Sequence, residues 1–215
     1  MSSITAELTH TCPYCKRQYN MTVYHTVDVG RDPELRDACL SGEIFTHSCP
    51  HCQKKYIVTN PLLYMDVEHR FVILFSETGH TYGMLNSSVA LTQEGFILRR
   101  CLTLEEFTEK IRILEEGADD VMVELAKYDS FIEYIDNRKG NPEDITGIRY
   151  EYTKDDIMKI TILADDKSMS FLIPIGALKA ELEAQADVYM VDNTMFPIVN
   201  GQWILSLFKE PEGQA

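Results

Sequence analysis

Two stretches of the chain repeat one another and decide how its N-terminal part folds. Residues 9–19 read THTCPYCKRQY, and residues 46–56 read THSCPHCQKKY. At this offset of 37 residues, six of the eleven positions are identical, and each stretch carries a Cys-Pro-x-Cys motif. Proline presets the backbone φ angle of a turn. We therefore predict two equivalent turns, each of which presents a pair of thiols.

The spacing of these cysteines predicts a metal site. Two Cys-x-x-Cys pairs supply four thiolates: Cys12, Cys15, Cys49 and Cys52. This is the ligand set of a structural zinc ribbon, because two sulfurs on one short turn can both reach a Zn²⁺ ion at about 2.3 Å. Four thiolates fill the tetrahedral shell and leave no position for a catalytic water. The sequence therefore predicts one structural zinc ion and no catalytic metal.

Redox chemistry is the alternative use of the same cysteines. Taken singly, each Cys-Pro-x-Cys motif looks like the active-site motif of thioredoxin-superfamily oxidoreductases, where the motif opens a helix that lowers the thiol pKa. Here apolar and polar residues alternate over 18–29, and 55–59 is rich in strand-forming residues. These patterns predict a strand after each motif. They favour zinc, and a thiol-disulfide function stays open as the second hypothesis.

The remaining cysteines and the nearby histidines are predicted to be structural. Cys39 and Cys101 have no cysteine near them in sequence, and we predict two buried, unreactive thiols. His25 lies on the apolar face of the alternating segment and is predicted to pack in the core. His10 and His47 each precede a cysteine pair by two residues; they either face solvent or donate a hydrogen bond to sulfur. No motif for a catalytic residue stands out.

The predicted elements of the N-terminal part are one helix and several strands. A helix is expected over 32–42, because an Asp-Pro-Glu start and a closing glycine flank a short apolar face. Strands are expected over 61–64 and 70–75. Residues 77–93 contain Gly, Asn, Ser and Thr and predict a loop.

The C-terminal part is predicted to combine helices with an antiparallel sheet. A capping box at 103–106 and an apolar face predict a helix up to Gly117, and Asp119 caps a second helix that ends near Asn137. Three strands joined by acidic turns, a helix and a short closing element follow: 148–152, 157–163, 168–175, 177–186 and 203–208. The fold class is therefore α+β, a zinc-ribbon-like β module followed by a unit of two helices and an antiparallel sheet.

Charge divides the chain in the same way. Residues 1–100 carry 9 basic and 10 acidic side chains, whereas residues 101–215 carry 11 and 24. All six histidines lie before residue 81. We therefore expect a metal-binding module over 1–95 and an acidic α+β domain over 96–215.

Composition limits the partners. The 215-residue chain has a formal net charge of -14, so it is repelled by nucleic acid backbones and anionic membranes. Its longest apolar run, Phe71–Phe75, has five residues, whereas a membrane helix needs about 20. Met1–His10 lacks the layout of a signal peptide. We expect a cytoplasmic protein whose partner is a protein with a neutral or basic surface. The oligomeric state stays open.

Further residues extend the pattern beyond the paired motifs. They include Asp32-Pro33-Glu34-Leu35, Ser41-Gly42, Phe45, Pro61-Leu62-Leu63-Tyr64 and Asp66, then Glu109-Lys110-Ile111-Arg112-Ile113, Gly117-Ala118-Asp119-Asp120 and Glu124-Leu125. With them, the chain resembles the bacterial CpXC-domain family. The resemblance implies that the four cysteines are metal ligands, and it implies no reaction or substrate. Lys16 and Gln53 stand where such turns commonly have glycine, at positions that often need a positive φ.

These observations lead to one main functional hypothesis. We expect a non-enzymatic zinc-binding protein, in which structural zinc organises a scaffold or a protein-interaction module. The alternative is a thiol-disulfide or redox-sensing protein. A nucleic-acid-binding zinc ribbon is not supported, because residues 1–60 carry six basic and six acidic side chains.

Overall fold

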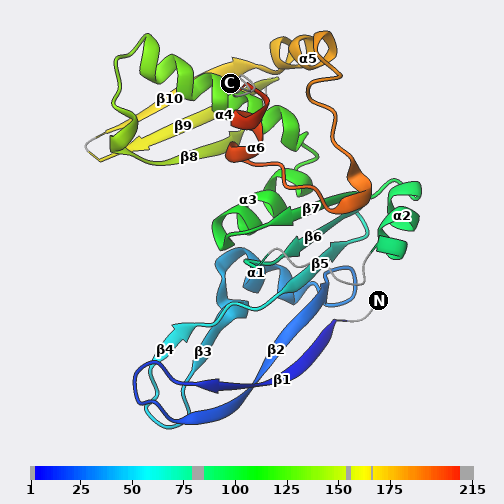
Figure 1. The fold of residues 1–215 in the computed structure, drawn as a ribbon, viewed down its shortest axis with the longest axis vertical. Coiled ribbons are helices and arrows are strands. Elements are labelled where there is room, and N and C mark those ends of the chain that lie inside the picture. The colour runs from blue at the N-terminus through cyan, green and yellow to red at the C-terminus, as the bar shows by residue number, and fades with distance from the viewer. Residues whose placement is uncertain (1–2, 79–84, 154–155, 166, 209–215) are drawn as a thin grey trace, which may run out of the picture. The chain divides into compact units, whose positions relative to one another are not determined.

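The computed structural model describes residues 3–78, 85–153, 156–165 and 167–208, and it is a mixed α+β structure, as the sequence predicts (Figure 1). The chain forms two compact units. The first unit comprises Met1–Glu115 and Asp192–Ile198, and the second comprises Glu116–Val191 and Val199–Ala215.

A five-stranded sheet forms the framework of the first unit. Its order is β1-β2-β5-β6-β7, with these bounds: β1 Ile4–Thr11, β2 Gln18–Asp28, β5 Leu62–Asp66, β6 Phe71–Phe75 and β7 Ile97–Cys101. The β1–β2 and β5–β6 pairs are antiparallel, whereas β2–β5 and β6–β7 are parallel. Only the last three residues of β2, Thr26 to Asp28, pair with β5. The rest of the β1–β2 hairpin therefore extends beyond the central part of the sheet, which is formed by β5, β6 and β7.

The elements that accompany this sheet within Met1–Glu115 include α1 Glu34–Ser41, the short 3-10 helix η1 Glu43–Phe45, α2 Leu85–Gln93 and α3 Leu104–Glu115. The apolar face of α3, with Phe107 and Ile111, packs in one core with Tyr64 and Phe75 of the sheet and Phe45 of η1. Every residue of β6 is buried, so the strand expected over 70–75 is covered on both faces.

Strand β7 and helix α3 belong to the first unit. The sequence places a boundary at 95/96, whereas the compact units of the structure divide at Glu115 and Glu116. The physical reason is that β7 pairs with β6 along its whole length, which satisfies the edge of a fully buried strand. Helix α3 then covers the sheet with Phe107, Ile111 and Leu114.

The predicted loop over 77–93 is wrong in part, because α2 occupies Leu85–Gln93; residues 79–84 of that loop lie outside the described residues. The helix is stabilised by a distant segment. Ser88 Oγ donates to the carbonyl of Thr194 at 2.7 Å, and Thr92 Oγ1 donates to the carbonyl of Asn193 at 3.2 Å. Contacts across about one hundred residues thus override the weak helical preference of Asn, Ser and Thr.

His25 is exposed, which contradicts its predicted place in the core. Ile4 pairs with Thr26, and the next residue, Thr5, pairs with Tyr24. His25 is therefore the extra residue of a β-bulge, which turns it away from the face that the alternation predicts. Cys39 and Cys101 are buried, as predicted, and burial raises the pKa of the Cys39 thiol to about 12.

The second unit contains the predicted antiparallel sheet and helices. Its sheet has the order β10-β9-β8, and its elements are α4 Asp120–Asp136, η2 Pro142–Asp144, β8 Ile145–Tyr152, β9 Ile157–Ala164, β10 Ser168–Pro174, α5 Ile175–Ala184 and α6 Gly201–Leu207. The Asp119 carboxylate caps α4 by accepting hydrogen bonds from the backbone N–H groups of Val121 and Met122. The chain returns to the first unit through η3 Asn193–Met195 before α6.

Within the described residues, we find no helix that has both the length and the apolar character to span a membrane.

Candidate metal centre

The cysteine pairs lie on the turns of two β-hairpins. The first pair connects β1 to β2, and the second connects β3 Thr46–Ser48 to β4 Lys55–Ile57. Thr11 pairs with Gln18 in the first hairpin, and Ser48 pairs with Lys55 in the second, so both turns contain six residues. The repeat in the sequence therefore becomes a repeat in the structure, and a strand follows each motif as predicted.

The two turns share one backbone hydrogen-bond pattern. In the first, the N–H of Cys12 donates to the carbonyl of Arg17, and the N–H of Lys16 donates to the carbonyl of Cys12, both at 3.0 Å. In the second, the N–H of Cys49 donates to Lys54 at 3.0 Å and the N–H of Gln53 donates to Cys49 at 2.8 Å. Equivalent backbones present their sulfurs in equivalent positions.

Lys16 and Gln53 occupy the left-handed region, with φ angles of 61° and 59°. Both residues therefore adopt the backbone conformation for which glycine is favoured, although neither is glycine. Both side chains are exposed. The cost is a backbone strain of about 1–2 kcal/mol at each position.

The four sulfurs form a compact cluster across the two hairpins. Cys12 Sγ lies 3.7 Å from Cys52 Sγ, and Cys15 Sγ lies 3.7 Å from Cys49 Sγ. All four sulfurs lie within 4.8 Å of one another. Ligands at about 2.3 Å from a tetrahedral Zn²⁺ ion stand about 3.8 Å apart, whereas the sulfurs of a disulfide stand about 2.05 Å apart. The spacing fits ligands of one metal ion, and all six cysteines are free of disulfides.

The cluster is half enclosed by protein. Cys12 and Cys49, the first cysteine of each pair, are 0% and 1% exposed, whereas Cys15 and Cys52 are partly exposed. A metal ion at this place would be held from inside by the first sulfur of each turn and covered from outside by the second.

The electrostatics of the cluster fit a cation at its centre. Burial raises the pKa of Cys12, but the backbone N–H groups of Cys15 and Tyr14, together with the thiols of Cys49 and Cys15, outweigh it and lower that pKa to about 6. At Cys52, the hydrogen bond from the N–H of Lys54 lowers the pKa. Burial and the neighbouring cysteines together outweigh this bond and raise the pKa of Cys52 to about 11. One thiolate thus makes the next harder to form. Full ionisation of all four requires a cation, which is what metal binding supplies.

Aromatic residues from both repeats meet beside the cluster. His10 pairs with Tyr19 across the first hairpin and His47 pairs with Tyr56 across the second. The hydroxyl groups of Tyr19 and Tyr56 lie 2.6 Å apart and join the two hairpins. Burial and nearby His10 lower the pKa of His47. The Nε2 atom of His47 is buried and has no hydrogen-bond partner among the described residues. This atom therefore neither faces solvent nor donates a hydrogen bond to a cysteine sulfur.

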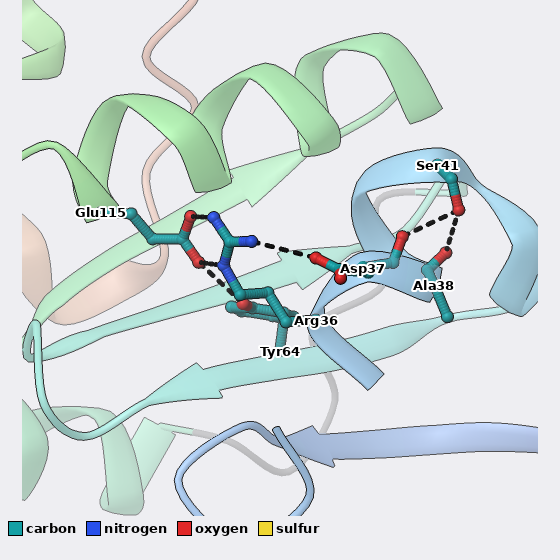
Figure 2. Close-up of polar contacts among 6 residues, drawn as sticks. All are labelled: Arg36, Asp37, Ala38, Ser41, Tyr64 and Glu115. Carbon is teal, nitrogen blue, oxygen red and sulfur yellow. Dashed lines mark hydrogen bonds and ion pairs between the residues drawn. The ribbon is translucent and has the colours of Figure 1, made fainter. Parts of the chain in front are cut away.

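Helix α1 lies in the chain segment between the two turns and is anchored by an ion pair (Figure 2). Arg36 donates from Nε and an Nη atom to both carboxylate oxygens of Glu115, at 2.8 and 2.7 Å. The Tyr64 hydroxyl donates to the same carboxylate at 3.3 Å, and Asp37 accepts a further bond from Arg36 at 3.0 Å. These contacts tie the loop between the cysteine pairs to α3. No local pattern predicts a pair 79 residues apart.

The fold and the site together define an α+β protein with a four-cysteine cluster that can hold a metal ion. Comparison with protein families gives a match to the CpXC protein family over residues 10–127, just over half of the chain, so the chain belongs to this family. The match begins near the end of β1, covers both cysteine pairs, strands β2, β5, β6 and β7 and helix α3, and ends inside α4. No curated protein and no solved structure matches the chain.

Proposed function

We propose that Cys12, Cys15, Cys49 and Cys52 hold one structural Zn²⁺ ion, which makes the facing hairpins a zinc-ribbon-like module. The observation that carries this proposal is the pair of 3.7 Å sulfur distances across the hairpins, because this spacing matches the edge of a tetrahedral thiolate shell. The family match contributes no reaction and no substrate.

The donor set favours zinc. Four thiolates in tetrahedral geometry suit zinc or iron, whereas magnesium and calcium prefer oxygen ligands. Zinc has no redox chemistry of its own, and four protein ligands leave no open position for water. The role that fits such a site is therefore structural, in a protein that is not an enzyme.

The redox alternative receives less support from the fold. Both motifs lie on hairpin turns that lead into β2 and β4, so neither thiol lies at the N-terminus of a helix, which is where the helix dipole would activate it. A thiolate that binds zinc also has its reactive electron pair engaged.

The acidic C-terminal part supplies the surface for a partner in this proposal. Its net charge of -13 over residues 101–215 favours a protein with a neutral or basic surface over nucleic acid or an anionic membrane. Free cysteines suit a reducing compartment such as the cytoplasm. In this proposal the metal-binding role lies in the module over 1–95. The partner surface lies in the acidic stretch over 101–215, of which α3 belongs to the first unit.

Metal analysis tests the proposal directly. Protein purified under reducing conditions without a chelator should contain one zinc ion per chain, as measured by inductively coupled plasma mass spectrometry. Cys49→Ser should abolish this content, because three thiolates close the shell poorly. Cys39→Ala is the matched control, since Cys39 is buried away from the cluster in the core around Phe45. A ratio near zero, or iron in place of zinc, would contradict the proposal.

A further inference from the structure

The second unit contains a cavity that the metal centre does not use. Its volume is about 480 Å³, which lies in the usual range for small-ligand sites. The cavity is lined by the segment that precedes α4, by α4, by β8 and β9, and by α5. We propose that it binds an alkylammonium group, carried either by a free amine or by a lysine side chain.

The inner wall of the cavity is apolar and adaptable. Met122 and Met158 line it and are 6% and 3% exposed, and the half-buried side chains of Ile175 and Leu182 join them. Methionine side chains adjust to irregular shapes. This wall suits an aliphatic chain, which gains free energy when it leaves water.

The rim of the cavity is acidic. Four carboxylates line it against a single ammonium group, which leaves a formal charge of -3: Glu116, Asp119, Asp156 and Glu183 against Lys179. The carboxylate of Asp119 already accepts hydrogen bonds at the start of α4. The other three acids are exposed and still outnumber Lys179. A cation is therefore attracted to this rim and an anion is repelled.

Tyr150 contributes an aromatic ring and a hydroxyl to the cavity. Its hydroxyl interacts with the rim carboxylate of Glu116, and burial and this carboxylate raise the pKa of Tyr150. A hydroxyl that donates to a carboxylate still has lone pairs, so its oxygen can accept a hydrogen bond from the N–H of a bound ammonium group. Tyr152 also lines the cavity and is 55% exposed, so its ring can attract a cation through its face. An apolar wall, an acidic rim and aromatic rings together recognise a cation on an aliphatic stem.

Calorimetric titration of the full-length, zinc-loaded protein tests this inference. Cadaverine is the probe for a free amine, and Nα-acetyl-lysine amide is the probe for a lysine side chain. We expect saturable binding of at least one of them, and the one that binds identifies the source of the ammonium group. Pentanol, which lacks the charge, and glutarate, which reverses it, should not bind. Absence of saturable heat with both amines, or equal binding of pentanol, would overturn the proposal.

Substitutions locate the binding in the cavity. Tyr150→Phe and Glu183→Gln should each weaken amine binding about two- to fivefold, the range for exposed polar and charged contacts. Glu143→Gln removes an exposed charge in η2, which does not line the cavity, and should leave the affinity unchanged. Glu183 is exposed, so its variant keeps the test valid if Tyr150→Phe disturbs the fold. Equal weakening in Glu143→Gln and Glu183→Gln would show general charge attraction and refute the site.

Discussion

Lys16 and Gln53 are the residues at which the turns depart from their favoured amino acid. Both have positive φ angles and exposed side chains, so glycine would remove strain without removing a packed side chain. The strain of about 1–2 kcal/mol is offset in part by the extra flexibility of glycine in the unfolded chain, about 0.5–1 kcal/mol.

We therefore predict that Lys16→Gly and Gln53→Gly each stabilise the first unit by about 0.5 kcal/mol. Urea unfolding of the zinc-loaded protein, followed by a probe in this unit, measures the change. Gln18→Gly is the matched control, because residue 18 begins strand β2, where glycine is unfavourable. If the turn variants were as destabilised as this control, the side chains at 16 and 53 would have a role that their exposure does not reveal.

Asp129 is a second residue whose environment makes a prediction. Burial and the carboxylate of Glu181 on α5 raise its pKa from 3.8 to about 6. The folded state therefore binds the proton more tightly than the unfolded state. The stability from this proton is complete below pH 4 and is lost as the pH rises through about 6.

Asp129→Asn should consequently stabilise the second unit at pH 7 and have little effect at pH 4. The expected gain is about 1 kcal/mol, because solvent screens a half-buried carboxylate. Thermal unfolding at the two pH values measures the difference. Asp136→Asn, at the end of the same helix, is the control. A gain of equal size at both pH values would rule out the proton as its cause.

At the scale of elements, the sequence predicts what is local and misses what depends on distant contacts. The capping box at Thr103 is present, since the N–H of Glu106 donates to Thr103 Oγ1 at 3.1 Å. The three-stranded meander and the paired turns are present as well. In contrast, β7 and α2 do not follow from local pattern. Their partners are β6 and the segment around Asn193, and nothing in residues 85–101 specifies either.

The candidate site divides in the same way. The cysteine spacing predicts the sulfur cluster because each pair needs only its own turn. The cavity of the second unit combines three separate stretches of the chain, so no single motif announces it. The predicted core position of His25 is wrong because one bulged residue shifts the alternation of buried and exposed residues along β2.

Helix α1 provides a prediction at this scale. Arg36→Ala should destabilise the first unit by about 1–2 kcal/mol, because it leaves the carboxylate of Glu115, with a side chain only 10% exposed, without its charged partner. Urea unfolding measures the loss. Adding Glu115→Gln to Arg36→Ala should recover part of it, since the unpaired charge is then removed.

Arg31→Ala is the matched control for Arg36→Ala. Arg31 Nε lies 3.9 Å from Asp28 Oδ2, and the Arg31 side chain is 64% exposed. The buried carboxylate of Asp28 keeps its hydrogen bond from the N–H of Gly30, so removal of Arg31 should change the stability very little. Equal effects of the two variants would mean that the two-pronged contact with Glu115 contributes nothing beyond an ordinary surface charge.

At the scale of the whole molecule, the four-cysteine cluster and the apolar core of the first unit support different elements. The core around Tyr64, Phe75 and Phe107 forms between the central sheet and α3, and it contains none of the four clustered cysteines. The β3–β4 hairpin has only three paired positions on each strand. An isolated hairpin of this size is not stable in water, so it should depend on the metal.

We therefore predict that removal of the proposed zinc ion by a chelator loosens the tips of the hairpins and leaves the rest of both units folded. Hydrogen exchange should speed up over 9–20 and 46–57, whereas the amides of β5, β6, α3 and α4 stay protected. The same pattern is expected for Cys49→Ser, and Cys39→Ala provides the control that keeps the metal. Helix α3 should remain protected together with the central sheet, because its apolar face packs against that sheet. If the amides of α4 opened together with those of the hairpin tips, the metal would stabilise both units, which would contradict the prediction that it stabilises the hairpins alone.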